Sequence, residues 1–235
     1  MTPCLAGADG CPFGWLCITR DAAREVRSAI FHNAHALCFQ SPTPDILCID
    51  IPIGLADRGP RQADLQARRI LAPHRHNSVF PAPARPVLAA PDYSAAAAIS
   101  RELDGKGISK QAFNIYAKIR EVDEALYANS ELRARVREVH PEICFWAWNG
   151  GCPMLHAKKS TQGRADRRIL IADHFGPGAF AAVRAAHRRA QASDDDIADA
   201  FAALWTAERI HAGQGATLPP DPPQDSRGLR MGMWY

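Results

Sequence analysis

One aspartate interrupts the most apolar strand-like segment of this chain, and it constrains the fold more than any other feature. The segment is Ile46-Leu47-Cys48-Ile49-Asp50-Ile51. A continuous apolar run of this length is typical of a strand buried on both faces, as in a parallel sheet between helices. An ionised carboxylate buried without a partner is strongly unfavourable. The chain is therefore expected to be an α/β protein in which Asp50 has a polar partner or a function.

The segments around this strand predict a mixed sheet. Residues 4–9, 13–20 and 25–31 are strand-like and joined by short turns, which favours antiparallel neighbours. A short helix near residues 32–39 leads to the apolar strand. The remaining periodic patterns predict helices over residues 62–71, 92–103, 109–128, 161–175, 179–190 and 194–211, and one more strand over residues 136–146.

The 235 residues are expected to form one domain. It would be a mixed five-stranded sheet flanked by helices, with a helical insertion over residues of about 58–134 between the fourth and fifth strands. A proline-rich tail covers residues of about 214–235.

Further carboxylates fall where such a sheet would bring them together. Asp9 ends the first strand-like segment, and Asp196 and Asp199 share one face of the last helix at i and i+3. Like charges that converge cannot all stay ionised, and a divalent cation removes the conflict. On the predicted 136–146 strand, Glu142 is a further candidate beside a bulge at Pro141, whereas Glu138 is expected to face solvent.

This order of elements is that of the ribonuclease H-like fold, and the sequence resembles one family with that fold across almost its whole length. The family is that of predicted ribonuclease H-like nucleases catalogued as domain of unknown function 429. The matching motifs are Gly7-Ala8-Asp9-Gly10-Cys11-Pro12, Ile49-Asp50-Ile51-Pro52-Ile53-Gly54-Leu55, Ser78-Val79-Phe80-Pro81-Ala82-Pro83, Gly105-Lys106-Gly107-Ile108-Ser109, Glu138-Val139-His140-Pro141-Glu142 and Asp199-Ala200-Phe201-Ala202-Ala203-Leu204.

The acidic residues and the resemblance together predict a nuclease that uses two Mg²⁺ or Mn²⁺ ions to cut a nucleic acid. Asp9 would bridge the ions, Asp50 and Asp199 would each hold one, and Asp196 or Glu142 would complete the coordination or assist water. Basic residues would hold flanking phosphates of the substrate. These candidates are Arg61, Arg68, Arg75, Lys118, Lys158 and Lys159.

Simpler interpretations stay open. Asp9 before Gly10 is a common turn pair, and Lys118 with Glu121 is a common surface ion pair. The whole chain could be a binding module without catalysis, or it could transfer phosphoryl groups from nucleotides. Seven cysteines without a Cys-x-x-Cys pair, and no signal peptide or membrane-spanning run, favour the cytoplasm.

Overall fold

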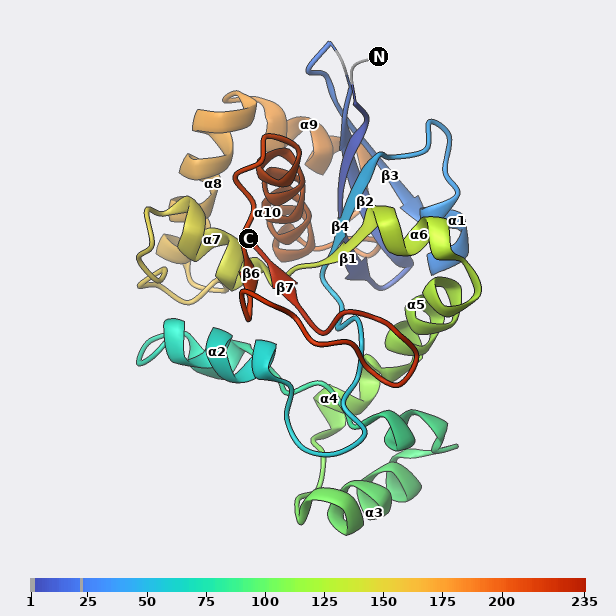
Figure 1. Cartoon of the computed structure of the whole chain (residues 1–235). Coiled ribbons are helices and arrows are strands. Elements are labelled where there is room, and N and C mark those ends of the chain that lie inside the picture. The colour runs from blue at the N-terminus through green and yellow to red at the C-terminus, as the bar shows by residue number, and fades with distance from the viewer. Residues whose placement is uncertain (1–2, 22) are drawn as a thin grey trace.

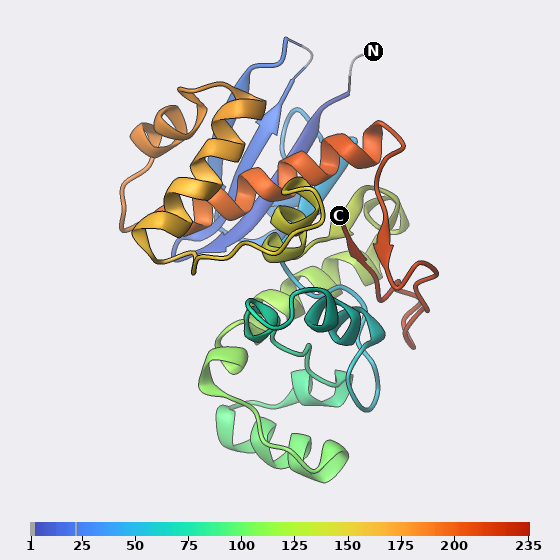
Figure 2. The same cartoon turned by 90° about the vertical axis from the view of Figure 1, so that its left-hand side faces the viewer.

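The chain forms a five-stranded mixed sheet with helices on both faces (Figures 1 and 2). The computed structural model describes residues 3–21 and 23–235. The sheet order is β3-β2-β1-β4-β5, in which β1, β4 and β5 are parallel while β2 runs antiparallel to both of its neighbours. The strands are β1 Leu5–Cys11, β2 Gly14–Arg20, β3 Val26–Phe31, β4 Ile46–Ile49 and β5 Val136–Glu138.

Ten α-helices are found in the described residues. They are α1 Ala34–Cys38, α2 Gln62–Ile70, α3 Tyr93–Asp104, α4 Lys110–Asn114, α5 Tyr116–Ala128, α6 Ser130–Arg135, α7 Pro141–Trp148, α8 Thr161–Phe175, α9 Ala179–Ala186 and α10 Asp194–His211. Two short 3₁₀ helices cover His76–Ser78 and Arg85–Ala89. None of the helices in the described residues has the length and apolar character needed to cross a membrane.

The alternation of side chains along β1 and β4 decides which residues face α10. Ala6, Ala8, Leu47 and Ile49 pack on the face that α1 and α5 cover. Leu5 and Cys48 pack on the opposite face, against α10. Because side chains alternate along a strand, Asp9 on β1 and Asp50 directly after β4 fall on the α10 face.

Gly7 allows α10 to lie unusually close to β1. A Cβ atom at this position would lie 2.0 Å from the backbone nitrogen of Leu204 and 2.4 Å from the carbonyl oxygen of Ala200. Only glycine permits this approach of the two backbones. It brings the first turns of α10, which carry Asp196 and Asp199, to the end of β1 that carries Asp9.

The helices between β4 and β5 lie largely outside the sheet. In both views α2, α3 and α4 lie beyond the carboxyl end of β4, and α5 leads back to the sheet (Figures 1 and 2). The C-terminal segment is not a loose tail. Its strands β6 Thr217–Leu218 and β7 Met233–Trp234 pair with each other, and Trp234 forms a bridge to Val139 beside β5.

The strand predicted over residues 136–146 is wrong beyond its first three residues. It ends at Glu138, and α7 begins at Pro141 with His140 as its N-cap. Proline is favoured at the first helical position because its missing N–H would be unpaired there. The alternating faces expected for this segment therefore do not exist, and Glu142 lies in the first turn of a helix.

Other boundaries differ less. The helix predicted over residues 109–128 divides at Ile115 into α4 and α5, and the one predicted over residues 179–190 ends at Ala186. Helix α10 spans the predicted residues, and Ser193 and Asp196 form a capping box at its start.

A buried ion-pair network joins β5 to α2, and it corrects two expectations. Glu138, expected to face solvent, is only 3% exposed, and so is Arg61. The Arg61 guanidinium donates to both carboxylate oxygens of Glu138, at 2.6 and 2.7 Å, and to Asp64 at 2.7 Å. Glu138 also accepts from the backbone N–H of Ile53 at 2.6 Å. All this places Arg61 in the interior, out of reach of a substrate phosphate.

Candidate functional site

Three of the predicted acidic residues converge where β1, β4 and α10 meet. Asp9 and Asp199 are 8% and 3% exposed, and Asp50 follows β4, with its N–H donating to the carbonyl of Ala8 at 3.0 Å. Burial, and then the charges of Asp50, Asp199 and Asp196, raise the pKa of Asp9 well above its ordinary value. The charges of Asp50, Asp199 and Asp196 therefore lie within electrostatic reach of Asp9.

Burial raises the pKa of each of the three central carboxyl groups. Burial raises the pKa of Asp50, although a hydrogen bond with Asp9 and the charges of His140 and Lys158 oppose this rise. Burial first, and then the charge of Asp50, raise the pKa of Asp199 to about 6. Burial and the negative charge of Asp50 beside it thus raise the pKa of Asp9.

Lys158 supplies a cation to this cluster. Its Nζ donates to Oδ2 of Asp199 at 2.8 Å, while its side chain remains 38% exposed. The charges of Asp199, Asp9 and Asp50 all raise the pKa of Lys158, so its ammonium group stays charged. Within residues 3–21 and 23–235, no three histidine, cysteine, aspartate or glutamate side chains are arranged to hold a metal ion as they stand.

Glu142 lies beside the cluster but is held by two arginines. Its Oε1 accepts from Arg167 at 2.8 Å, and Arg75 Nε lies 3.6 Å from its Oε2. The Oε2 atom is buried and has no hydrogen-bond partner among the described residues. The charge of Glu142 also raises the pKa of Asp199, which shows that the two carboxylates are near each other. Arg75, predicted to bind substrate, is therefore paired with Glu142 at the edge of the site.

Asp196 lies at the rim of the site. Its side chain accepts from the backbone N–H of Ser193 at 2.8 Å, as part of the capping box. One carboxylate oxygen of Asp196 is therefore used in capping the helix. The negative charge of Asp196 still raises the pKa of Asp9.

Of the remaining basic residues predicted to bind phosphates, one lies beside the site and two bind backbone carbonyls elsewhere. Lys159 is exposed and follows Lys158 directly. Lys118 donates to the carbonyl of Gly14 at 2.6 Å and lies over the Trp15 ring, and Arg68 donates to the carbonyl of Val79 at 2.7 Å. Lys118 and Arg68 thus have backbone partners already.

A basic hollow continues from Lys158 along α8 and the start of α10. Lys158, Arg164, Arg168 and Asp199 line its inner part. The outer part, an open hollow of about 600 Å³, is lined by Lys159, Arg164, Arg168 and Arg189 together with Ser193, Asp194 and Asp195. Four basic side chains against two acidic ones make this outer hollow positive, although Asp194 is paired with Arg168 and Arg189.

The family model for proteins of unknown function named DUF429 matches residues 7–224, which include Asp9, Asp50, Glu142, Lys158, Asp196 and Asp199. The chain belongs to this family. Neither a curated protein nor a solved structure matches the chain. The resemblance expected from the motifs is confirmed at the level of the family.

Two residues of this site were missed by the sequence analysis. His140 lies close enough to lower the pKa of Asp50, and Arg167 holds Glu142. His140 is the N-cap of α7, and Arg167 on α8 meets Glu142 in the first turn of α7, so both roles depend on α7 being a helix. The signal was the run His140-Pro141-Glu142, in which a capping residue, a proline and an acid are typical of a helix start.

Asp9→Asn is expected to stabilise the protein at neutral pH. In the wild type a raised pKa means that Asp9 favours the folded state while it is protonated, and that this contribution is lost as the pH rises through the folded-state pKa. Asparagine keeps the neutral form at every pH. We expect a gain of about 1 kcal/mol near pH 8, or about 2–4 °C in Tm, and little change near pH 5.

The measurement is thermal unfolding in chelator across this pH range. Asp173→Asn, which changes an exposed aspartate on α8, is the matched control and should show no such pH-dependent gain. A lower Tm for Asp9→Asn at every pH would mean that Asp9 is a structural residue instead.

Proposed function

We propose that this chain is a divalent-metal-dependent nuclease with a ribonuclease H-like fold. The observation that carries the proposal is the convergence of Asp9, Asp50 and Asp199 from three separate elements, with the charges of the last two raising the pKa of the first. Buried like charges are unfavourable, and their retention at one point of a fold is typical of a functional site.

The strand order supports the fold assignment. An antiparallel β2 and β3 precede the parallel strands β4 and β5, and a final helix covers β1. Asp9 lies on the first strand, Asp50 directly after the fourth and Asp199 on the last helix, which is the placement expected of a ribonuclease H-like nuclease. On this assignment the helices α2 to α6 form an insertion between the fourth and fifth strands.

The donor atoms suit Mg²⁺ or Mn²⁺. Both ions prefer carboxylate oxygens, and Asp9, Asp50 and Asp199 would be the ligands, with Asp196 at the rim. When bound, a pair of such ions supplies an activated water and stabilises the charge on the leaving oxygen. In the present arrangement the Lys158 ammonium neutralises part of the same negative charge. Metal binding would release Lys158 from Asp199.

Lys158 and the basic hollow are the proposed contacts of the substrate backbone. A released Lys158 is partly exposed and can bind the phosphate next to the reacting one. Lys159, Arg164 and Arg168 would bind phosphates further along the strand. Arg61, which is buried, is no part of this surface.

Glu142 is proposed to position a water molecule. Its Oε2 is a buried acceptor that has the charge of Arg75 nearby but no hydrogen-bond partner among the described residues, and such an atom is costly unless a water or a substrate group satisfies it. Arg167 fixes the carboxylate, so that Oε2 keeps its direction.

The proposed compartment is the cytoplasm. All seven cysteines are free thiols, and burial raises the pKa of several of them, which makes them poor nucleophiles. Free buried thiols are typical of proteins in a reducing environment.

The test is cleavage of labelled single-stranded, duplex and branched DNA and RNA. We expect cleavage of at least one substrate with Mg²⁺ or Mn²⁺, none with chelator, and binding with little cleavage in Ca²⁺. Lys159→Gln should weaken binding on every sequence and reduce its salt dependence, because a phosphate contact is lost. The control is Lys106→Gln, which removes an exposed lysine in the loop after α3.

One observation favours a second candidate, a nucleic-acid-binding module without catalysis. Lys158 already neutralises Asp199, as a structural ion pair would. Salt-sensitive binding without metal-dependent cleavage of any substrate would support this module and contradict the nuclease. Neither binding nor cleavage would leave phosphoryl transfer from nucleotides as the surviving hypothesis.

A further inference from the structure

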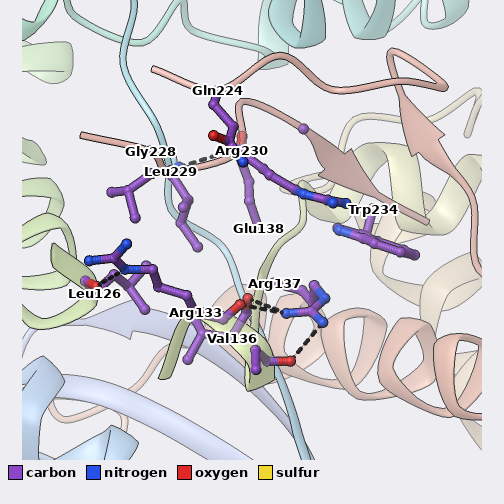
Figure 3. A pocket seen from close by; sticks show the side chains of 13 residues that line it. Leu126, Arg133, Val136, Arg137, Glu138, Gln224, Gly228, Leu229, Arg230 and Trp234 are labelled. Atoms are coloured by element: carbon purple, nitrogen blue, oxygen red, sulfur yellow. Dashed lines mark hydrogen bonds between the residues drawn. The ribbon is translucent and has the colours of Figure 1, made fainter. Parts of the chain in front are cut away.

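A second pocket, separate from the carboxylates, lies at the edge of the sheet. It is a cavity of about 420 Å³ between β5, α6 and the C-terminal segment (Figure 3). Its volume falls in the range of small-molecule sites. Leu126, Val136 and Leu229 form apolar walls, and Arg133, Arg137, Arg230 and Trp234 supply the polar and aromatic groups.

The charge of this pocket is not neutralised. Arg133, Arg137 and Arg230 form no ion pair with any carboxylate in the described part of the chain, whereas the buried Arg61 and Arg167 are both paired with glutamates. The one acid that lines the pocket, Glu138, is bound by Arg61. The pocket therefore carries three guanidinium charges, and Arg133 and Arg137 have backbone carbonyls rather than carboxylates as partners.

Arg137 is held in place without a counter-ion. Its Nη1 donates to the carbonyl of Val136 at 2.9 Å, and its Nη2 donates to that of Ala134 at 2.7 Å. Carbonyl groups fix the guanidinium but do not cancel its charge. Burial lowers the pKa of Arg137, and the nearby charge of Arg230 lowers it further. Two like charges thus face the same space.

Trp234 adds a flat aromatic surface to this positive pocket. The Arg137 guanidinium lies over the Trp234 ring, 5.6 Å from its centroid. Figure 3 shows Arg230 extending from the C-terminal segment, and Arg137 from β5, both toward Trp234. Arginine binds phosphate in a bidentate manner, and an indole stacks on planar bases.

From this geometry we propose that the pocket binds a nucleoside monophosphate, with its phosphate on Arg230 and Arg137 and its base against Trp234 and the apolar walls. A phosphate alone would leave the apolar walls unfilled, and a neutral base would leave the charges unpaired. The site is independent of the proposed nuclease activity, because none of the converging carboxylates lines it.

The test is calorimetric titration of the full chain with adenosine 5′-monophosphate, adenosine and inorganic phosphate in chelator. We expect a Kd below about 1 mM for the nucleotide and at least tenfold weaker binding of the other two. Arg230→Gln and Trp234→Leu should each weaken the nucleotide about tenfold, because each removes one of the two recognition elements. Arg101→Gln, which changes an exposed arginine on α3, should leave binding unchanged.

The carboxylate cluster provides the control for location. Asp50→Asn should leave nucleotide binding in this pocket unchanged, whatever it does to cleavage. Three results would overturn the proposal: no binding of the nucleotide, inorganic phosphate binding as tightly as the nucleotide, or binding that survives both pocket substitutions. None of these depends on whether the protein cuts nucleic acid.

Discussion

Asp50→Asn is expected to abolish metal-dependent cleavage while the protein stays folded. Asparagine has the size of aspartate but not its charge, so the packing at the end of β4 is kept while the proposed ligand is lost. Removing a group that stabilises charge in the transition state costs on the order of 10³-fold in rate. Nucleic-acid affinity should change little, because phosphates are proposed to bind the basic hollow instead.

The measurement is single-turnover cleavage, with binding followed in Ca²⁺ and thermal unfolding recorded in parallel. Asp173→Asn serves as the matched control, since it removes the same charge from the surface of α8. If Asp50→Asn cleaved normally and unfolded at a much lower temperature, Asp50 would be a structural residue and the assignment of the site would be wrong.

Arg61→Ala is expected to destabilise the protein more than any surface substitution. The side chain links Glu138 of β5, Asp64 of α2 and the carbonyls of Ile53 and Gly54 after β4. Removing it leaves two buried carboxylates without a counter-ion. Breaking a buried ion pair from one side costs about 3–5 kcal/mol, so Tm should fall by about 6–20 °C.

Chemical and thermal unfolding measure this loss. The control is Arg58→Ala, three residues away and exposed, which should stay within about 0.5 kcal/mol of the wild type. A loss below about 1 kcal/mol for Arg61→Ala would indicate that water replaces the guanidinium and that the network is not needed to hold α2 against the sheet.

Much of the fold could be read from local patterns. The short turns between β1, β2 and β3 dictate antiparallel neighbours, and the apolar run of β4 dictates a buried strand. Helix α10 begins and ends as predicted, because its capping box and its apolar periodicity lie within one continuous segment. Alternation of side chains along β1 and β4 places Asp9 and Asp50 on one face of the sheet, and Asp199 lies near them because α10 packs on that face.

The segment after β5 could not be read in this way. Residues 136–146 alternate in polarity like a strand, yet only Val136–Glu138 pair with β4. The helix after them is decided by His140 as N-cap, by Pro141 and by packing of α7 against α10. Alternation of polar and apolar residues over so short a stretch does not exclude a helix, because tertiary contacts can bury more than one side of that helix.

The ion-pair partners of the charged residues also could not be predicted from the sequence. Arg61 and Lys158 both belong to basic stretches, and nothing local distinguishes them. Arg61 is buried because Glu138 and Asp64 lie within reach in space, while Lys158 joins the acidic cluster through Asp199 on a helix 41 positions later in the chain.

Apart from the segment that forms α7, the sequence alone thus determined where most strands and helices lie and that Asp9 and Asp50 share a face of the sheet, because these depend on periodicity and on neighbours within a few residues. Only the tertiary structure decided which basic groups neutralise which acids, and that Arg133, Arg137 and Arg230 pair with no acid among residues 3–21 and 23–235. Electrostatic partners are set by distance in space, and their energy depends on burial, which local sequence does not encode.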